Sequence, residues 1–183
     1  MHAFRNNTQD HRHALVTDVA VVTALGNRLG DLWGGLLRKE TAIRAILRFR
    51  VEQGHYTSKI AAIIDDLVPL PGRSLLIALL DRLVDQMGPV PADTVLITAT
   101  IKSGIDHLES ECRGRPTGMQ DFLLTSLADH LGARLGLTNN GTCISAACAS
   151  STLAVARAAA LRASGQAEAG RGCCAVRVWA GGG

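Results

Sequence analysis

Continuous apolar and β-branched runs mark the strands that we expect in this chain. Residues 15–23 (LVTDVAVVT), 94–100 (TVLITAT) and 142–146 are of this kind, and such runs are typical of strands buried on both faces. A shorter strand is expected at about residues 59–64. The hydrophobic pattern therefore predicts several short strands distributed along the whole sequence.

Between these runs, apolar residues recur every three or four positions, which is the spacing of a helix with one buried face. The helices that this spacing predicts cover residues 29–37, 76–87, 119–135 and 149–164. Asn27 is expected to cap the first helix at its N-terminus. Gly136 and Gly165 are expected to end the last two, because glycine readily adopts the left-handed backbone that follows a helix.

The alternation of strands and helices predicts an α/β fold, with a mainly parallel mixed sheet covered by helices. No linker divides the 183 residues, so we expect a flexible N-terminal segment, 1–14, and one domain, 15–183. Apolar residues make up 47% and charged residues 19% of the chain, a balance typical of globular proteins. Aromatic residues are only 3%, so the core must consist of Leu, Val, Ile and Ala.

Charge and hydropathy restrict the environment and the partners. The net charge of +3 is too small to indicate binding to nucleic acid or to an anionic membrane. No uncharged apolar stretch reaches the roughly 18 residues that a membrane span needs, and the N-terminus lacks the apolar core of a signal peptide. Five cysteines without a regular framework fit a reducing compartment. A cytoplasmic location is therefore expected.

The sequence offers no strong metal or cofactor site. It holds no C-x-x-C pair, and Cys173 and Cys174 are adjacent, which is an awkward geometry for zinc. The DHRH string at residues 10–13 is expected to be a mobile terminal segment rather than a weak metal site. We expect neither a metal nor a cofactor.

Cys148 is the candidate for chemistry, since it lies between a predicted strand and a predicted helix in CISAACASSTL, 143–153. Free main-chain N–H groups and the positive end of the helix dipole favour a nucleophilic thiolate there. The same N–H groups could stabilise an oxyanion. A small buried hydrophobe is the alternative interpretation of a lone cysteine among alanines.

A catalytic cysteine needs a base or a hydrogen-bond partner. Spacing alone identifies no histidine for this role. His107 lies in a helical or loop context, and His130, beside Asp129, is expected to be a surface residue.

Three segments resemble the β-ketoacyl synthase family. CISAACASSTLAVARAAALRASGQAE, 143–168, resembles its active-site segment of strand, A-C-[AS]-S-[SG], helix and S-G-x-A-[DE]. Residues 21–49 resemble its opening strand, V-x-x-x-L-G turn and first helix, and TVLITATIKSGIDHLE, 94–109, resembles the strand and glycine loop before the family's central insert. The resemblance covers most of residues 15–168.

This resemblance implies the N-terminal half of a thiolase-like fold and an acyltransferase that condenses an acyl group with malonyl on acyl carrier protein, in fatty-acid or polyketide synthesis. It implies that Cys148 accepts the acyl group and that its main-chain N–H forms part of the oxyanion hole. Ala147 and Ala149 would keep the elbow around the cysteine tight. The preceding strand would lie near a dimer contact, so a homodimer or a hetero-partner is expected.

Departures from the family also set expectations. Its members are about twice this length, and their two catalytic histidines lie in the C-terminal half. Residues 169–183 form an atypical tail, although 173–179 could still form a strand. We therefore expect an incomplete enzyme, from a truncated or frame-shifted gene. The alternatives are an inactive remnant, a non-catalytic partner subunit, or a thiolase-type fragment that uses acyl-coenzyme A.

Overall fold

A three-stranded parallel sheet forms the centre of the protein. The computed structural model describes residues 14–47, 59–68, 70–117, 120–166 and, for the backbone alone, 173–177. The strand order is β4 (Thr142–Ile144), β3 (Val95–Ala99), β5 (Cys173–Arg177), and both pairings are parallel. The expected mainly parallel sheet is confirmed for these strands, and the tail does contribute one of them.

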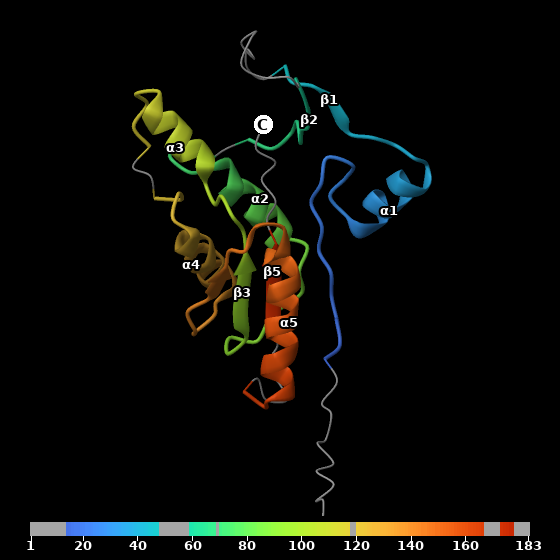
Figure 1. Ribbon diagram of the computed structural model, residues 1–183, viewed down its shortest axis with the longest axis vertical. Helices are drawn as coiled ribbons and strands as arrows, with labels where there is room; N and C mark the ends of the chain where they lie inside the picture. Colours follow the sequence, from blue (N-terminus) through green and yellow to red (C-terminus); the bar gives the residue numbers. More distant parts are fainter. Residues whose placement is uncertain (1–13, 48–58, 69, 118–119, 167–172, 178–183) are drawn as a thin grey trace, which may run out of the picture.

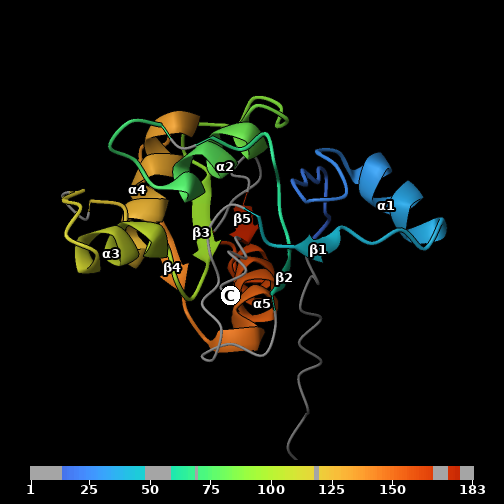
Figure 2. The ribbon, with the colours of Figure 1, turned by 90° about the horizontal axis from the view of Figure 1, so that it is seen from above.

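Helices cover both faces of this sheet, as expected for an α/β protein. Helix α5 (Ser150–Ala163) lies along one face, and α2 (Leu75–Val84) and α4 (Leu124–Leu135) pack together on the other (Figures 1 and 2). Ile97 and Ala99 of β3 pack with Ala154 of α5, whereas Leu96 packs with α2 and α4. The sequence of β3 is a continuous apolar run because both of its faces are buried.

The larger core lies between α2, α4 and β3. Its buried members are aliphatic, as the low aromatic content predicts: Leu76, Ile77, Leu80, Val84, Leu96, Leu127, Ala128 and Leu131. Gly141 allows α4 to approach the start of β4, because a Cβ there would lie 2.8 Å from the Ala128 Cβ. Gly136 ends α4 with a left-handed φ of 67°, as expected.

Helix α3 (Ile105–Cys112) was not predicted. Its sequence, IDHLESEC, is mostly polar, and its two aliphatic residues, Ile105 and Leu108, are only half-buried. The inward-facing position is occupied by His107, which is buried, and Asp106 accepts hydrogen bonds from Ser74 Oγ and from the Leu75 N–H. Polar contacts hold this helix, and hydrophobic periodicity does not detect them.

The N-terminal part differs most from expectation. The strand expected at 15–23 does not form. Only the single bridge between Thr23 and Gly26 is present, and Leu15 and Val16 are 82% and 81% exposed. A strand is stable only when neighbouring strands pair with its main-chain N–H and C=O groups. Among the described residues, no strand pairs with residues 15–22, so a strand-like sequence alone does not produce a strand there.

Helix α1 (Leu29–Leu37) has the bounds of the first predicted helix, but the expected buried apolar face and the expected cap were both wrong, since Trp33, Leu36 and Leu37 are exposed. Arg28 occupies the N-cap position with extended backbone, and no side chain caps the helix, because α1 begins one residue later than a cap at Asn27 requires. Strands β1 (Ile43–Ala45) and β2 (Ile60–Ala62) form a separate antiparallel pair. Both views place α1 apart from the parallel sheet (Figures 1 and 2).

Several predicted boundaries also shift. The helix expected from residue 119 begins at Leu124, because Asp121 in the preceding turn bonds to the N-terminus of α2 instead. The strand expected to reach residue 146 ends at Ile144, and a 3₁₀ turn, η1 (Ala147–Ala149), precedes α5. The expected flexible segment and the DHRH string lie almost entirely outside the described residues.

None of the helices in the described part of the chain combines the length and the hydropathy of a membrane span.

Candidate functional site

The candidate site is the turn that joins β4 to α5, which we call the elbow (residues 145–150). Cys148 is the middle residue of η1 and lies two residues before Ser150, the first residue of α5. Its side chain is exposed. The sequence-based placement of Cys148 between a strand and a helix is therefore correct, and the interpretation as a small buried hydrophobe is wrong.

The backbone of the elbow reverses sharply at Ala147, which has a positive φ of 47°. A non-glycine residue in this region carries a modest strain of about 1 kcal/mol. A main-chain hydrogen bond across the turn offsets this strain, since the Ala149 N–H donates to the Ala146 carbonyl at 3.0 Å. Ala147 and Ala149, the residues expected to keep the elbow tight, therefore both contribute to its main-chain geometry, and both are exposed.

Ser150 holds the elbow from the helix side. Its Oγ accepts a hydrogen bond from the Ala146 N–H at 2.8 Å and donates one to the Ala147 carbonyl at 2.9 Å. The Ser150 N–H donates to the same carbonyl. Ser150 is only 4% exposed, so these bonds are shielded from water. The sequence analysis did not predict this role of Ser150. The serine in the A-C-A-S string was the one feature of the sequence that could have indicated it.

Within the described part of the chain, neither the Cys148 thiol nor its main-chain N–H has a hydrogen-bond partner. The thiol is thus open to a reagent from solvent. The N–H is open to an acceptor that arrives with the reagent. Chemically, the elbow presents a nucleophile and a main-chain donor on the same residue.

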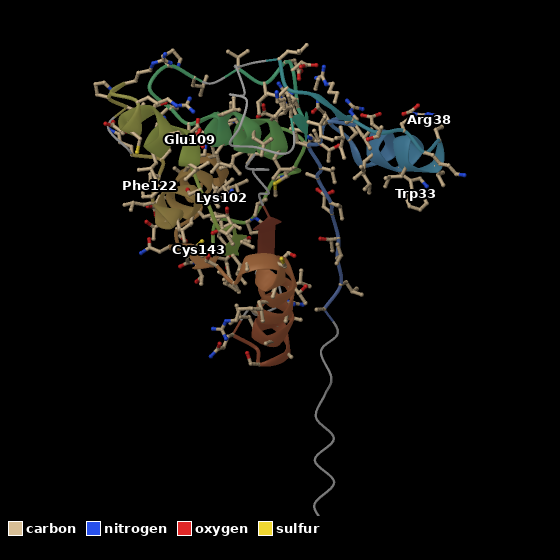
Figure 3. All side chains as sticks on the ribbon, turned by 45° about the horizontal axis from the view of Figure 1, so that its top comes forward. Trp33, Arg38, Lys102, Glu109, Phe122 and Cys143 are labelled. Atoms are coloured by element: carbon tan, nitrogen blue, oxygen red, sulfur yellow. The ribbon has the colours of Figure 1, made fainter. Side chains whose placement is uncertain are left out.

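The elbow lies at the carboxyl edge of the parallel sheet, which is the edge where α/β proteins usually place their ligands. The Thr100 N–H, just after β3, donates to the Ile144 carbonyl at the end of β4 at 3.3 Å. Lys102 in the following loop is half-buried, and Figure 3 shows it on the same side of the molecule as Cys143 of β4, opposite Trp33 of α1. Sequence reasoning did not single out Lys102 as a site residue.

A buried polar cluster fixes the loop of residues 100–104 beside the elbow. The carbonyl of Asp121 accepts from the Gly104 N–H at 2.9 Å and from Ser103 Oγ at 3.0 Å. Its carboxylate accepts from the Arg73 guanidinium and from the Ser74 N–H. Burial alone raises the pKa of the Asp121 carboxyl, but the bonds from Arg73 and Ser74 outweigh burial, and the resulting pKa lies below the ordinary value.

The two histidines considered from the sequence are engaged elsewhere. His130 Nε2 lies 2.8 Å from Asp81 Oδ1, and its side chain is mostly buried between α2 and α4. The expectation of a surface histidine was wrong, because Asp81 and the adjoining helix cover the ring. His107 is buried in α3, and its Nδ1 has no partner among the described residues. Neither histidine is hydrogen-bonded to Cys148.

A hollow of about 600 Å³ lies away from the elbow, between residues 23–27, 40–44 and 63–66. Its charged lining is already neutralised in pairs, since Glu40 bonds to Arg38, Asp65 to Arg44 and Asp66 to Arg82. The hydrogen bond from Arg38 lowers the pKa of Glu40, and the bond from Arg82 lowers that of Asp66. We place no chemistry in this hollow, because it contains neither a nucleophile nor an unpaired charge.

No group of three or more His, Cys, Asp and Glu side chains with metal-binding geometry occurs in the described ranges. Cys112 ends α3 and is exposed, and Cys143 lies half-buried in β4. Cys173 and Cys174 lie in β5, which is described by its backbone alone.

Searches against models of protein families and against curated proteins find no match to this chain.

Proposed function

We propose that Cys148 is the acyl-accepting nucleophile of an acyltransferase of the β-ketoacyl synthase type. The Cys148 thiolate attacks the carbonyl carbon of an acyl thioester, and its main-chain N–H donates to the oxyanion that forms. The intermediate collapses by breaking the carbon–sulfur bond to the carrier. The carrier sulfur leaves as a thiolate and takes up a proton from water, and the acyl group remains on Cys148.

One structural observation carries this proposal. Cys148 presents an exposed thiol and a main-chain N–H to which none of the described residues bonds, in the same turn at the N-terminus of a 14-residue helix. The positive end of that helix favours the negative charge that develops on the oxyanion. The resemblance of residues 143–168 to the family's active-site segment supports the assignment to acyl transfer.

The fold and the partners belong to the same proposal. The parallel sheet with helices on both faces is compatible with part of a thiolase-like fold. The carrier is an acyl carrier protein, and the acyl group is destined for fatty-acid or polyketide synthesis. β4 is an edge strand within the described sheet, which is compatible with a dimer contact or a hetero-partner beside the elbow. Acyl transfer is the whole of the proposed reaction, because no described acid or base bonds to Cys148.

Acyl transfer can be tested by incubating the chain with acyl-loaded carrier protein and, in parallel, with the matching acyl-coenzyme A. We expect the acyl mass on the peptide that contains Cys148, formed faster from the carrier protein. Faster transfer from coenzyme A indicates the thiolase-type alternative. Absence of acyl-Cys148 from both donors overturns the proposed function.

Cys112 provides the matched control for reactivity. It is exposed like Cys148, but it ends α3, at the negative end of its helix. With iodoacetamide at mildly acidic pH, we expect Cys148 to be labelled faster than Cys112. Equal labelling of the two cysteines would show that the elbow does not activate the thiol.

A non-catalytic partner subunit is the second candidate, and one observation favours it. Trp33, Leu36 and Leu37 of α1 are 61%, 53% and 66% exposed, and grouped exposed apolar residues mark interaction surfaces. In that case, Cys148→Ala would leave binding to the partner chain unchanged.

A further inference from the structure

We propose that Ser150 is a positioning residue that aims the main-chain N–H of Cys148 at the reacting carbonyl. This inference rests on the proposed acyl transfer to Cys148. It assigns a separate task to the buried serine two residues after the nucleophile.

One peptide unit joins Ala147 to Cys148. This unit contains the Ala147 carbonyl and the Cys148 N–H, and the described chain contains no cis peptide bond. In a planar trans peptide the carbonyl and the N–H point in opposite directions. Any contact that fixes the Ala147 carbonyl therefore also fixes the direction of the Cys148 N–H.

Ser150 fixes that carbonyl twice. Its hydroxyl donates to the Ala147 oxygen at 2.9 Å, and its main-chain N–H donates to the same oxygen. Both donors lie on the helix side of the elbow, so the opposite side of the peptide unit, with the Cys148 N–H, faces away from α5. An acyl oxygen that approaches Cys148 from solvent then meets an N–H that is already oriented.

The hydroxyl of Ser150 also holds the preceding peptide. It accepts from the Ala146 N–H at 2.8 Å, which ties down the residue before the strained φ of 47° at Ala147. Without this bond, the Ala147 peptide could relax toward a more common conformation and rotate the Cys148 N–H. Preorganised donors of this kind are effective because they need no reorientation during the reaction.

A second hydroxyl next to Ser150 offers a control. Ser151 is half-buried one residue further along α5, and no described hydrogen bond links its hydroxyl to the elbow. Ser150→Ala removes the hydroxyl bonds but keeps the main-chain bond to Ala147. Ser151→Ala removes a hydroxyl of equal size that makes no such bonds.

The test compares two reactions at the same thiol. Acylation by hexanoyl-pantetheine passes through an oxyanion, whereas alkylation by iodoacetamide is a direct displacement and does not. For Ser150→Ala we expect acylation of Cys148 to slow by roughly fivefold, the effect of one typical hydrogen bond, with the alkylation rate unchanged. Ser151→Ala should change neither rate, and Ser150→Thr, which keeps the hydroxyl, should retain most of the acylation rate.

The other outcomes separate the two ideas. If the unaltered chain is alkylated but never acylated, the proposed function fails, and the role of Ser150 fails with it. If the unaltered chain is acylated and Ser150→Ala is acylated equally fast, only the role of Ser150 is overturned. A parallel loss of acylation and alkylation in Ser150→Ala also overturns it, since the serine would then support the turn or the thiol rather than the N–H.

Discussion

At the scale of single residues, buried polar side chains determine where the loops around the elbow lie. Asp121 is the clearest case. It is 3% exposed, its carboxylate holds Arg73 and Ser74, and its carbonyl holds Ser103 and Gly104. One residue thereby links the N-terminus of α2 to the loop beside the site.

Asp121→Asn tests this link. Because the pKa of Asp121 is lowered in the folded state, its charge stabilises the fold above the unfolded pKa of about 3.9, and this contribution disappears as pH falls through the folded pKa. We expect a loss of about 2–3 kcal/mol in the free energy of unfolding at neutral pH. Urea unfolding followed from pH 7 to pH 3 should show the difference between the two proteins shrinking below about pH 4.

Glu40→Gln is the control for that experiment. Glu40 forms its ion pair with Arg38 at the surface, where solvent screens the charges and such pairs contribute little. We expect no measurable change in unfolding. A difference for Asp121→Asn that stays constant down to pH 3 would show that shape, rather than charge, accounts for the loss.

At the scale of elements, two glycines should respond to alanine in opposite ways. A Cβ at Gly104 would lie 2.6 Å from the Asp121 carbonyl oxygen, whereas nothing lies within 4 Å of a Cβ at Gly132, inside α4. Gly104→Ala should cost about 1–3 kcal/mol by overpacking. Gly132→Ala should gain about 0.5–1 kcal/mol by helix propensity. Thermal unfolding of both variants checks the two signs, and equal signs would contradict the packing around Gly104.

The leucine series of α4 provides a second prediction for that element. Leu131 is fully buried, whereas Leu123, at the N-cap of the helix, is 62% exposed. Leu131→Ala should lower the free energy of unfolding by about 2–5 kcal/mol, since it leaves a cavity between α4 and α2. Leu123→Ala should change it by less than about 0.5 kcal/mol. Comparable losses for the two variants in urea unfolding would mean that Leu123 is buried in the core like Leu131, and would contradict its exposure.

At the scale of the whole molecule, the exposed apolar side chains of α1 should cause self-association. We expect the sedimentation coefficient to rise with protein concentration, and the double change Trp33→Ser with Leu37→Ser to reduce this rise. Leu123→Ser, which alters a comparably exposed leucine at the N-cap of α4, should leave the rise unchanged. A chain that remains monomeric at all concentrations would contradict an interaction surface on α1.

The elements that were predicted well are those with a regular apolar pattern, whether or not that pattern ends up buried. Five elements fall near their expected ranges: α1, α2, β3, α4 and α5. The apolar side chains of α2, β3 and α4 are buried, whereas those of α1 are mostly exposed. The position of Cys148 followed from the same patterns, since the residue lies between two of these elements. In α3, the apolar residues Ile105 and Leu108 were too few to predict a helix, and buried His107 and the bonds of Asp106 hold it in place.

By itself, the sequence determined the α/β alternation and the placement of Cys148 between β4 and α5, because both depend on local periodicity. The helices between successive strands also predicted that the central strands pair in parallel. Only the tertiary structure decided that residues 15–23 form no strand, since a strand exists only through its partner. It also decided the positive φ of Ala147 and the bonds of Ser150 across the elbow. These features arise where β4 meets α5, and the hydrophobic pattern does not record how two elements meet.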